Sequence, residues 1–564
     1  MSRKTTAIKH VDHIVEILLQ KGLSHAVVSP GSRNAPIIIA LDARDQIQKH
    51  VVTDERSAGF VALGIAQQTQ QPVIVVCTSG SAVLNYAPAV SEAFYQNIPL
   101  IVISADRPAD WTDQGDGQTI RQIGALDPHV AKTFQVDAQH QDNIWAVNGQ
   151  VNEAWEIALQ ERLPVHLNLP LSAPLYDQVD YTPYPKVRTF EVAKVEEQVH
   201  PETLDKLLHQ WHQAERKMIL IGQNDVDHGL NKWIGILADF PDVSILTENL
   251  SNVQHPKIVH CIDRTLAGVP ADEIAAYQPD LLITIGSAVV SKRVKKFLRQ
   301  SNIQHNWKIG KYMIFQDTYC HLTTSIAMDH NNFLSALTSS VQPDPENRFG
   351  LQWKQLDYIK EDQHNQFLQQ AKYADLTVFH TLLDFLPDNS VLHLGNSSVV
   401  RYAQLFNPIR NIIYYGNRGT SGIDGSTSTA VGAALVDTDR CHTIITGDLS
   451  FFYDSNALWN HHLTENLRII VINNAGGDIF KIIDGPSHTG AVEKYFYATH
   501  DKKAKHLCQA FNIHYMASDS IEAIEEQMIS FFEIKDDKRP VLMEIHTPTD
   551  QNAPMLQKYF ESLR

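Results

Sequence analysis

TGDLSFFYDSNALWNHHLTENLRIIVINNAGGDIF, residues 446–480, is the stretch of the chain that decides the fold. An apolar run ends at Gly447-Asp448, a helical pattern follows, and a second apolar run ends at Asn473-Asn474. The separation of about 26 residues between Asp448 and Asn474 suits a strand–helix–strand unit, which brings both strand ends to one edge of a parallel sheet. Ligands of open α/β sheets bind at this edge, so the stretch predicts a binding site there.

The residue types at this edge indicate the kind of ligand. A carboxylate from Asp448, an amide oxygen from Asn474 and a free backbone carbonyl are hard oxygen ligands of the kind that Mg²⁺ prefers, and phosphate oxygens commonly complete its shell. Gly447, Gly476 and Gly477 would let the backbone approach phosphates without a Cβ in the way. Either half alone is ordinary turn chemistry, but the two together predict a diphosphate and metal site.

Three blocks of the chain alternate short β-branched runs with longer helical patterns, which is typical of parallel α/β layers. The runs are nearly continuous in apolar character, as expected of strands covered on both faces. They are residues 26–29, 73–77 and 100–104, then 218–222, 243–246 and 281–286, and finally 391–395, 443–448, 468–473 and 541–546. We therefore expect an α/β protein of three domains, each with a central, mostly parallel sheet flanked by helices.

Two proline-bearing stretches separate the blocks, because proline resists regular structure. The first ends with Pro183 and Pro185, and the second contains Pro343 and Pro345. Boundaries near 185 and 355 give domains at 1–185, 186–355 and 356–564.

Charge and hydropathy exclude several classes of protein. The 564 residues include 47 Lys and Arg against 64 Asp and Glu, a formal net charge of −17, which argues against general binding to nucleic acid or a membrane surface. No run approaches the roughly 20 apolar residues that span a bilayer, so membrane insertion is not expected. Five scattered cysteines predict neither a disulfide framework nor a zinc site.

The N-terminus lacks the apolar stretch and cleavage site of a signal peptide, so we expect a cytoplasmic protein. It predicts instead an amphipathic helix with Val11, Ile14, Val15 and Leu18 along one face.

The diphosphate and metal pattern resembles the thiamine-diphosphate motif of the 2-oxo-acid decarboxylase and acetolactate synthase superfamily. That motif usually begins G-D-G, whereas this chain has Gly447-Asp448-Leu449. This departure narrows the choice of subfamily. The resemblance implies the thiamine-diphosphate-binding fold and a Mg²⁺ or Mn²⁺ ion held by Asp448, Asn474 and the carbonyl of Gly476. It also implies that the cofactor contacts Gly422, Ile423, Gly447, Leu449, Ser450, Phe480 and Ile483, the last two as an apolar cover or as ordinary core.

Thiamine diphosphate needs a carboxyl group that shares a proton with its ring nitrogen N1′, and the superfamily supplies a Glu at the end of a first-domain strand. Burial of a carboxyl group raises its pKa and makes such sharing possible. In VVTDERSAGFVALGIAQ, Glu55 follows a β-branched run and precedes a helix of small residues, so it is the expected partner of N1′. The alternative is a helix N-terminal charge or half of an ion pair.

The cofactor must also be held bent, which the superfamily achieves with a bulky apolar side chain. In NRGTSGIDG, Ile423 stands among Gly419, Gly422 and Gly425 and matches this wedge. The alternative is that Ile423 fills a small core cavity.

Further segments resemble one branch of the superfamily, whose reaction joins 2-oxoglutarate to isochorismate with loss of CO₂ in menaquinone biosynthesis. These are SPGSRNAP (29–36), DERSAGFVALG (54–64), residues 78–108, GNSSVVR (395–401), NRGTSGIDG (417–425) and GDLSFFYD (447–454). The implied reaction decarboxylates 2-oxoglutarate and adds the succinyl-semialdehyde carbanion to isochorismate by 1,4-addition.

The two substrates together present three carboxylates, which require fixed cations, and arginine grips carboxylates bidentately. By the resemblance, the substrate-binding residues are Ser32, Arg33, Arg107, Gln118, Lys292, Arg293, Ser397, Arg401 and Arg418. Gln118 would lie near the reacting carbon, and it forms the catalytic set with Glu55 and the four arginines Arg33, Arg107, Arg401 and Arg418.

Plain alternatives remain for several of these residues. Arg33 follows a possible turn and helix cap. Arg107 could form a surface ion pair with Asp106 or Asp110. The basic segment SKRVKK (291–296) could be a solvated helix end, above all at Lys295 and Lys296.

Active sites of the superfamily lie between the first domain of one subunit and the third domain of another, which implies a homodimer or homotetramer. Glu55 and Asp448 would then serve one cofactor from different chains. Two other functions stay open. An acetolactate-synthase-like or oxalyl-coenzyme-A-decarboxylase-like enzyme would be expected to lack the arginine set, and a cofactor-free structural paralogue would have no need of Glu55, Asp448 and Asn474.

Overall fold

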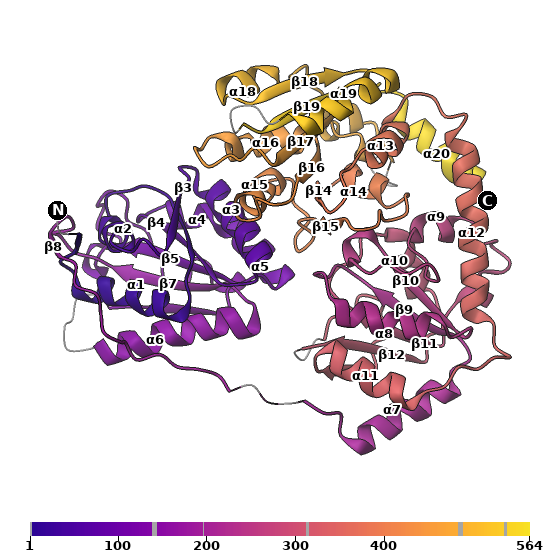
Figure 1. Ribbon diagram of the computed structural model, residues 1–564, viewed down its shortest axis with the longest axis horizontal. Coiled ribbons are helices and arrows are strands. Elements are labelled where there is room, and N and C mark those ends of the chain that lie inside the picture. The colour runs from indigo at the N-terminus through magenta and orange to yellow at the C-terminus, as the bar shows by residue number, and fades with distance from the viewer. Residues whose placement is uncertain are drawn as a thin grey trace.

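The computed structural model describes residues 3–137, 144–193, 195, 197–311, 315–482, 489–534 and 539–564. The chain forms three domains, and the third contacts each of the other two (Figure 1). The expectation of three α/β domains with parallel sheets is confirmed.

The first and third domains share one sheet topology. Counted within each domain, the strand order is 2-1-3-4-6-5 in both, and every pairing is parallel. The first sheet contains β2 (His25–Val28), β3 (Gln48–Val51), β4 (Val73–Cys77), β5 (Leu100–Asp106), β6 (Lys132–Gln135) and β7 (Val165–Pro170). The third contains β14 (Val391–Leu394), β15 (Ile413–Tyr415), β16 (His442–Gly447), β17 (Leu467–Asn473), β18 (His514–Ser518) and β19 (Val541–His546).

The second domain has a five-stranded parallel sheet of order 2-1-3-4-5, which is the order of flavodoxin-like folds. Its strands are β9 (Lys217–Ile221), β10 (Val243–Thr247), β11 (Leu281–Ile285), β12 (His305–Gly310) and β13 (Thr324–Ala327). A small antiparallel pair, β1 (Lys4–Thr6) with β8 (Gln178–Asp180), closes the outer end of the first domain. Each apolar run predicted from the sequence coincides with a strand.

Helices cover both faces of each sheet. In the first domain they are α1 (Lys9–Lys21), α2 (Ala35–Asp42), α3 (Glu55–Thr69), α4 (Ala82–Asn85), α5 (Ala87–Gln96) and α6 (Ile144–Glu156). In the second they are α7 (Pro201–Gln213), α8 (His228–Ala238), α9 (Ile262–Ala267), α10 (Lys292–Arg299), α11 (His330–Ser340) and α12 (Phe349–Leu368). In the third they are α13 (Asp375–Asp384), α14 (Ser398–Ala403), α15 (Ser426–Val436), α16 (Asp448–Tyr453), α17 (Ile479–Ile482), α18 (Lys505–Ala510), α19 (Ile521–Glu533) and α20 (Asn552–Ser562).

One hydrophobic core runs from the first domain into the third. It joins Val75 and Val102 of the first sheet, through the facing helices α3 and α15, to Ile444 and Ile469 of the third sheet. The two helices cross closely because each carries a glycine at the contact. A Cβ on Gly64 would lie 2.0 Å from the Thr429 carbonyl oxygen, and one on Gly432 would lie 2.0 Å from that of Val61. The two domains are therefore packed as a near-symmetric pair.

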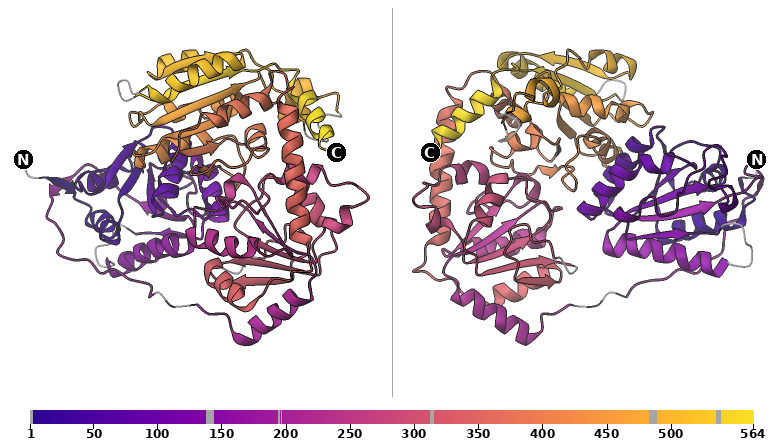
Figure 2. Two further views of the ribbon diagram at one scale, coloured as in Figure 1. Left: turned by 45° about the vertical axis from the view of Figure 1, so that its right-hand side comes forward. Right: turned by 180° about the vertical axis from the view of Figure 1, so that it is seen from behind.

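The second domain is attached by polar contacts to both of the others. Gln223 donates from Nε2 to Gln96 Oε1 of the first domain and to the Gly416 carbonyl of the third, each at 2.8 Å. Asn252 pairs with the backbone of Tyr414 at 2.9 and 2.8 Å. The long helix α12 runs along the second domain toward the third, where it meets α20 (Figure 2).

The N-terminal amphipathic helix is confirmed as α1, which buries Val11, Ile14, Val15 and Leu18. All five cysteines are free thiols. Within the described part of the chain, no helix has the length and apolar character needed to cross a membrane.

A buried histidine predicts acid sensitivity of the first domain. His166, on β7, is buried with Nε2 2.7 Å from Ser104 Oγ, and burial lowers the pKa of His166 to about 4. In the unfolded chain, His166 binds a proton near pH 6.5. The neutral, buried His166 therefore makes its full contribution to the stability of the folded state above that pH, and this contribution is lost as the pH falls toward 4. Lowering the pH from 7 to 5 should therefore decrease the free energy of unfolding of the unaltered protein by about 2 kcal/mol more than that of a His166→Gln variant.

Urea unfolding curves at both pH values measure this difference, with His209→Gln, at an exposed position of α7, as the control. If the free energy of unfolding decreases equally at pH 5 in the unaltered protein and the His166→Gln variant, His166 is not the source of the acid sensitivity.

Candidate functional site

The sequence pattern at 446–480 folds as predicted, into two neighbouring parallel strands. β16 pairs with β17, with Gly447 opposite Ile472, so Asp448 and Asn474 follow the ends of adjacent strands. Asp448 is the first residue of α16 and is 2% exposed. The backbone N–H groups of Leu449 and Gly476 donate to its two carboxylate oxygens at 2.6 and 3.0 Å. The structure thus brings Asp448 and Gly476 together.

Asn474 joins this cluster with one end of its amide bonded and the other end open. Its side chain is nearly buried, and Nδ2 donates to Asp375 Oδ2 at 3.2 Å. Its Oδ1 has no hydrogen-bond partner among the described residues. The Tyr497 hydroxyl donates to the Asn474 carbonyl at 3.0 Å and fixes the backbone. The Asn474 amide is therefore bonded to a buried carboxylate at its nitrogen end and left unbonded at its oxygen end.

The charges of the cluster fit a divalent cation. Burial raises the pKa of Asp448 to about 6, against the opposing effects of its backbone donors and of His500. Burial also raises the pKa of Asp375 to about 7, and the nearby carboxylates of Asp478 and Asp448 add to that rise. Two buried carboxylates thus lie near each other, and a divalent ion would favour the ionised form of both.

No group of three His, Cys, Asp or Glu side chains gathers as metal ligands in the described ranges. Ligation at this cluster would therefore depend on the amide and carbonyl oxygens as well as on Asp448. His500 is the neighbour that the sequence pattern missed, with Nε2 3.2 Å from Asp448 Oδ2.

The glycine-rich loop 417–425 lies against α16, the helix that begins at Asp448. The Ser450 hydroxyl of α16 donates to the Ile423 carbonyl at 3.0 Å, which ties the expected wedge residue to the expected diphosphate helix. Asn396 donates from Nδ2 to the carbonyls of Asn417 and Gly422 at 2.7 and 2.6 Å. Gly422, Ile423, Ser450 and Asp448 therefore belong to one local structure.

Glu92, on α5 of the first domain, holds the start of this loop. Its buried carboxylate accepts hydrogen bonds from the backbone N–H groups of Gly419 and Thr420 at 2.6 and 2.7 Å, and from the Thr420 hydroxyl at 2.6 Å. No motif marks this role in the sequence, because the partners lie 327 and 328 residues away.

Glu55 lies in a pocket of the first domain with a volume of about 420 Å³. It begins α3, where Asp54 caps the helix, and its Oε2 accepts from Asn85 Nδ2 at 3.3 Å. The pocket is lined by Glu55, Thr78, Ser79, Gly80, Ser81, Ala82, Asn85, Gln118, Thr119 and Ile120, all from the first domain. Gln118 has a positive φ of 54°, and a Cβ on Gly80 would lie 3.1 Å from its Cα. Glu55 and Gln118 thus face one cavity.

Arg33 and Arg107 stand near this pocket. Arg33 donates to the Leu171 carbonyl at 2.8 Å, and burial and Arg107 both lower the pKa of Arg33. Arg107 pairs with Asp116 at 3.0 Å and donates to the Gly117 carbonyl at 3.1 Å, next to Gln118. Its ion pair is therefore with the loop that carries Gln118, rather than with Asp106 or Asp110, and Asp106 accepts instead from the backbone N–H of Arg107. Ser32 is exposed beside Arg33.

A second cationic group forms where the second and third domains meet. Arg418 is buried and donates to Asn396 Oδ1 at 2.6 Å, and burial, followed by Arg401, lowers the pKa of Arg418. Burial also lowers the pKa of Arg401. The Nε atoms of both arginines have no hydrogen-bond partner among the described residues. Ser397, at the start of α14, has a positive φ of 73°.

The basic segment 291–296 forms the start of α10, and its cationic side chains differ in burial. Lys292 and Lys296 are exposed, and Arg293 lies 4.1 Å over the Phe560 ring. Lys295 is half-buried. Burial lowers the pKa of Lys295, and Arg418 and Arg401 lower it further against the opposing effect of Glu248. The structure thus adds Lys295 to the arginine pair, which the sequence left open as a solvated position.

Phe480 packs against Phe496 at a ring-centroid distance of 5.6 Å. Ile483, the other expected cofactor cover, lies outside the described residues.

The start of α3 and the end of α16 are joined within the chain. Asn456 donates to Asp54 Oδ2 at 2.7 Å, and Arg56 donates to the Tyr453 carbonyl at 2.8 Å. Asp448 stands at the opposite end of α16 from these contacts. The residues of the Glu55 pocket all come from the first domain, whereas the Asp448 cluster comes from the third.

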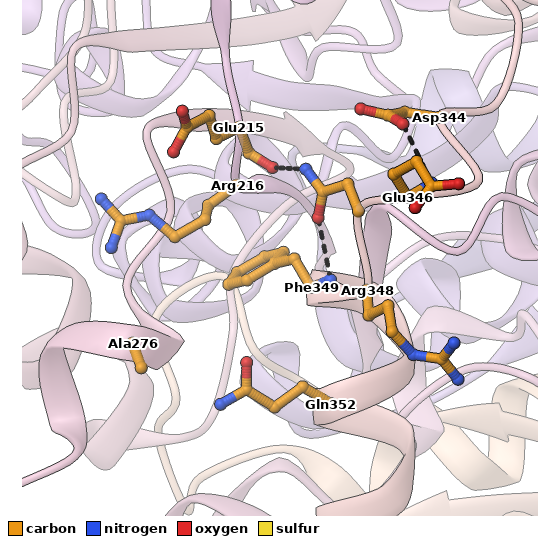
Figure 3. Close-up of a pocket in the computed structure, with 9 residues that line it drawn as sticks. Glu215, Arg216, Ala276, Asp344, Glu346, Arg348, Phe349 and Gln352 are labelled. Carbon is orange, nitrogen blue, oxygen red and sulfur yellow. Dashed lines mark hydrogen bonds between the residues drawn. The ribbon is translucent and has the colours of Figure 1, made fainter.

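A larger pocket of about 560 Å³ lies in the second domain and contains none of the expected site residues. Asn347 bonds to the Glu215 carbonyl and accepts from the Phe349 N–H, and the Glu346 N–H donates to Asp344 (Figure 3). It lies apart from the residues of the first and third domains described above.

Comparison with known proteins agrees with this geometry. Family models described as "Thiamine pyrophosphate enzyme, N-terminal TPP binding domain", "Middle domain of thiamine pyrophosphate" and "Thiamine pyrophosphate enzyme, C-terminal TPP binding domain" match residues 8–125, 190–394 and 394–545. A crystal structure of benzoylformate decarboxylase from Polynucleobacter necessarius superposes with a TM-score of 0.73 at 15% identity, over 96% of this chain and 99% of that one, which shows the shared fold. The fold and the site together define a thiamine-diphosphate (thiamine pyrophosphate) enzyme.

Full-length relatives narrow the class. Proteins named 2-succinyl-5-enolpyruvyl-6-hydroxy-3-cyclohexene-1-carboxylate synthase from Christiangramia forsetii and Flavobacterium johnsoniae are 40% and 39% identical, over 98% of this chain and 98% of theirs. The protein of that name from Bacteroides thetaiotaomicron is 38% identical over 99% of both chains. This chain belongs to the family of these synthases.

Proposed function

We propose that the protein decarboxylates 2-oxoglutarate and adds the resulting succinyl-semialdehyde unit to isochorismate by 1,4-addition. The products are 2-succinyl-5-enolpyruvyl-6-hydroxy-3-cyclohexene-1-carboxylate and CO₂, in menaquinone biosynthesis. The observation that carries the proposal is a pair of neighbouring arginines, the buried Arg418 and the half-buried Arg401, whose Nε atoms have no hydrogen-bond partner among the described residues. Cations held in this way are suited to substrate carboxylates. When bound, thiamine diphosphate supplies the electron sink that decarboxylation requires.

The cofactor would contact both terminal domains. Glu55 would hold a proton at N1′ of the aminopyrimidine, and Ile423 would keep the cofactor bent. The diphosphate and its surroundings would be contacted by Gly422, Gly447, Leu449, Ser450, Phe480 and Ile483.

A magnesium or manganese ion would be held by Asp448, by Oδ1 of Asn474 and by the carbonyl oxygen of Gly476. Support comes from the unbonded, buried amide oxygen of Asn474 and from the buried carboxylate of Asp448, which lies 3.0 Å from the backbone nitrogen of Gly476.

Substrate carboxylates would be bound from three domains. Ser32, Arg33, Arg107 and Gln118 would act from the first, Lys292 and Arg293 from the second, and Ser397, Arg401 and Arg418 from the third. Arginine suits this task because its planar guanidinium matches a carboxylate with two hydrogen bonds.

The working unit would be a homodimer or homotetramer in the cytoplasm. The Glu55 pocket is lined by the first domain alone, and the Asp448 cluster lies at the far end of α16 from the contacts of α3. A third domain from a second copy would then complete the Glu55 site.

The test is an assay with 2-oxoglutarate, with and without isochorismate, in the presence of thiamine diphosphate and Mg²⁺. We expect consumption of both substrates and a product of the mass of the named carboxylate. Consumption of pyruvate or of a coenzyme-A thioester in their place would overturn the assignment and favour an acetolactate-synthase-like or oxalyl-coenzyme-A-decarboxylase-like enzyme.

A further inference from the structure

Asp375 is a buried carboxylate with no place in the sequence motifs. It is the first residue of α13, it is 1% exposed, and it stands 99 residues before Asn474 in the chain. An acidic residue in the first turn of a helix commonly faces solvent, where it favours the helix dipole. Asp375 instead faces inward, toward the proposed metal ligands, so its position calls for another explanation.

Two contacts orient this carboxylate, and a third holds the backbone of Asp375. Its Oδ1 accepts from the Thr547 hydroxyl at 2.7 Å, and its Oδ2 accepts from Asn474 Nδ2 at 3.2 Å. Its backbone N–H donates to Asn552 Oδ1 at 2.8 Å. Thr547 follows β19, Asn474 follows β17 and Asn552 begins α20, so Asp375 is held at the carboxyl edge of the sheet by three separate segments.

The contact with Asn474 decides which end of the amide faces the cluster. An amide has an oxygen at one end and a donor NH₂ group at the other, with nearly the same shape. With Nδ2 on Asp375, the unbonded Oδ1 faces away from that carboxylate. The opposite orientation would set Oδ1 against a carboxylate oxygen and leave the NH₂ group where a cation needs an oxygen.

We propose that Asp375 is a positioning residue of the metal site, which holds the Asn474 amide with its oxygen toward the cation. This inference rests on the proposed function of Asp448, Asn474 and Gly476 as ligands. It follows a general pattern, because partners that orient metal ligands commonly change metal affinity about 10- to 100-fold when they are removed.

The test measures Mn²⁺ binding to the full-length protein, freed of metal and saturated with thiamine diphosphate, by the electron paramagnetic resonance signal of free Mn²⁺. Asp375→Leu, which removes the acceptor at similar size, should weaken Mn²⁺ binding about 10- to 100-fold. Asp384→Leu, at the exposed far end of the same helix, should leave it unchanged. Equal affinity in Asp375→Leu and the unaltered protein would overturn the inference.

A second background separates positioning from a general loss of structure. In Asn474→Asp, both ends of the side chain are oxygens, so its orientation no longer matters, and Asp375 then opposes a like charge. In that background, Asp375→Leu should leave Mn²⁺ affinity unchanged or increase it. The same loss in both backgrounds would show a structural role and overturn the inference. Absence of Mn²⁺ binding by the unaltered protein would instead refute the proposed metal site itself.

Discussion

Replacing Glu55 by glutamine should slow exchange of the C2 proton of bound thiamine diphosphate about 10²- to 10⁴-fold, the range of a lost acid–base group. A glutamine amide cannot share a proton with N1′, although its oxygen can still accept from Asn85 as the carboxylate does. Asp54 would continue to cap α3. The variant therefore tests the chemistry of one carboxyl group with little change in shape. Deuterium exchange followed by NMR after rapid quenching measures the rate.

The matched control is Glu161→Gln, an exposed position of the same domain, which should exchange at the rate of the unaltered protein. Affinity for the cofactor, measured by its effect on the melting temperature, should change little in either variant. A normal exchange rate in Glu55→Gln would remove Glu55 from the proposed role.

The fold was predictable from the sequence wherever strands are covered on both faces. Runs such as VIVVC at β4 are apolar throughout and bounded by turn residues, so they need no knowledge of their partners. Several of the strands without a prediction carry polar residues. β3 and β6 are edge strands that are partly exposed. β7 is buried but contains His166 and Asn168, which bond to Ser104 of β5.

The extent of the second domain stays a prediction. The proposed boundary near 355 falls inside α12, a single helix of 20 residues that packs on β10 and α9 and also on α20. Prolines mark where a helix does not continue, but they do not show to which domain the helix that follows them belongs.

The candidate site was predictable where its residues are close in sequence. The Asp448 to Asn474 unit folds from one strand–helix–strand segment, and the structure brings its ends together. Glu92, Asp375 and Lys295 were missed or left open because their partners come from other segments or other domains. A single charged residue in a helix carries no sequence signal that tells such a contact from a solvated position.

Replacing Arg401 or Arg418, the arginine pair where the second and third domains meet, should strongly weaken substrate binding. Arg401→Ala or Arg418→Ala should weaken substrate binding by about 2–5 kcal/mol. This is the usual result of truncating one partner of a buried pair of opposite charges, here an arginine and a substrate carboxylate. At about tenfold for each 1.4 kcal/mol, this is a rise of more than tenfold in the KM of the affected substrate. Steady-state kinetics with each substrate varied in turn will show which of the two depends on each arginine.

The two variants should differ in one respect, because their contacts differ. Arg418 donates to Asn396 Oδ1, and Asn396 in turn holds the Gly422 carbonyl of the loop that carries Ile423. Arg418→Ala should therefore lower kcat as well, whereas Arg401→Ala should act mainly on KM. Arg410→Ala, at an exposed position of the same domain, should change neither constant. If both constants stay unchanged in Arg401→Ala and Arg418→Ala, the pair stabilises the domain junction and binds no substrate carboxylate.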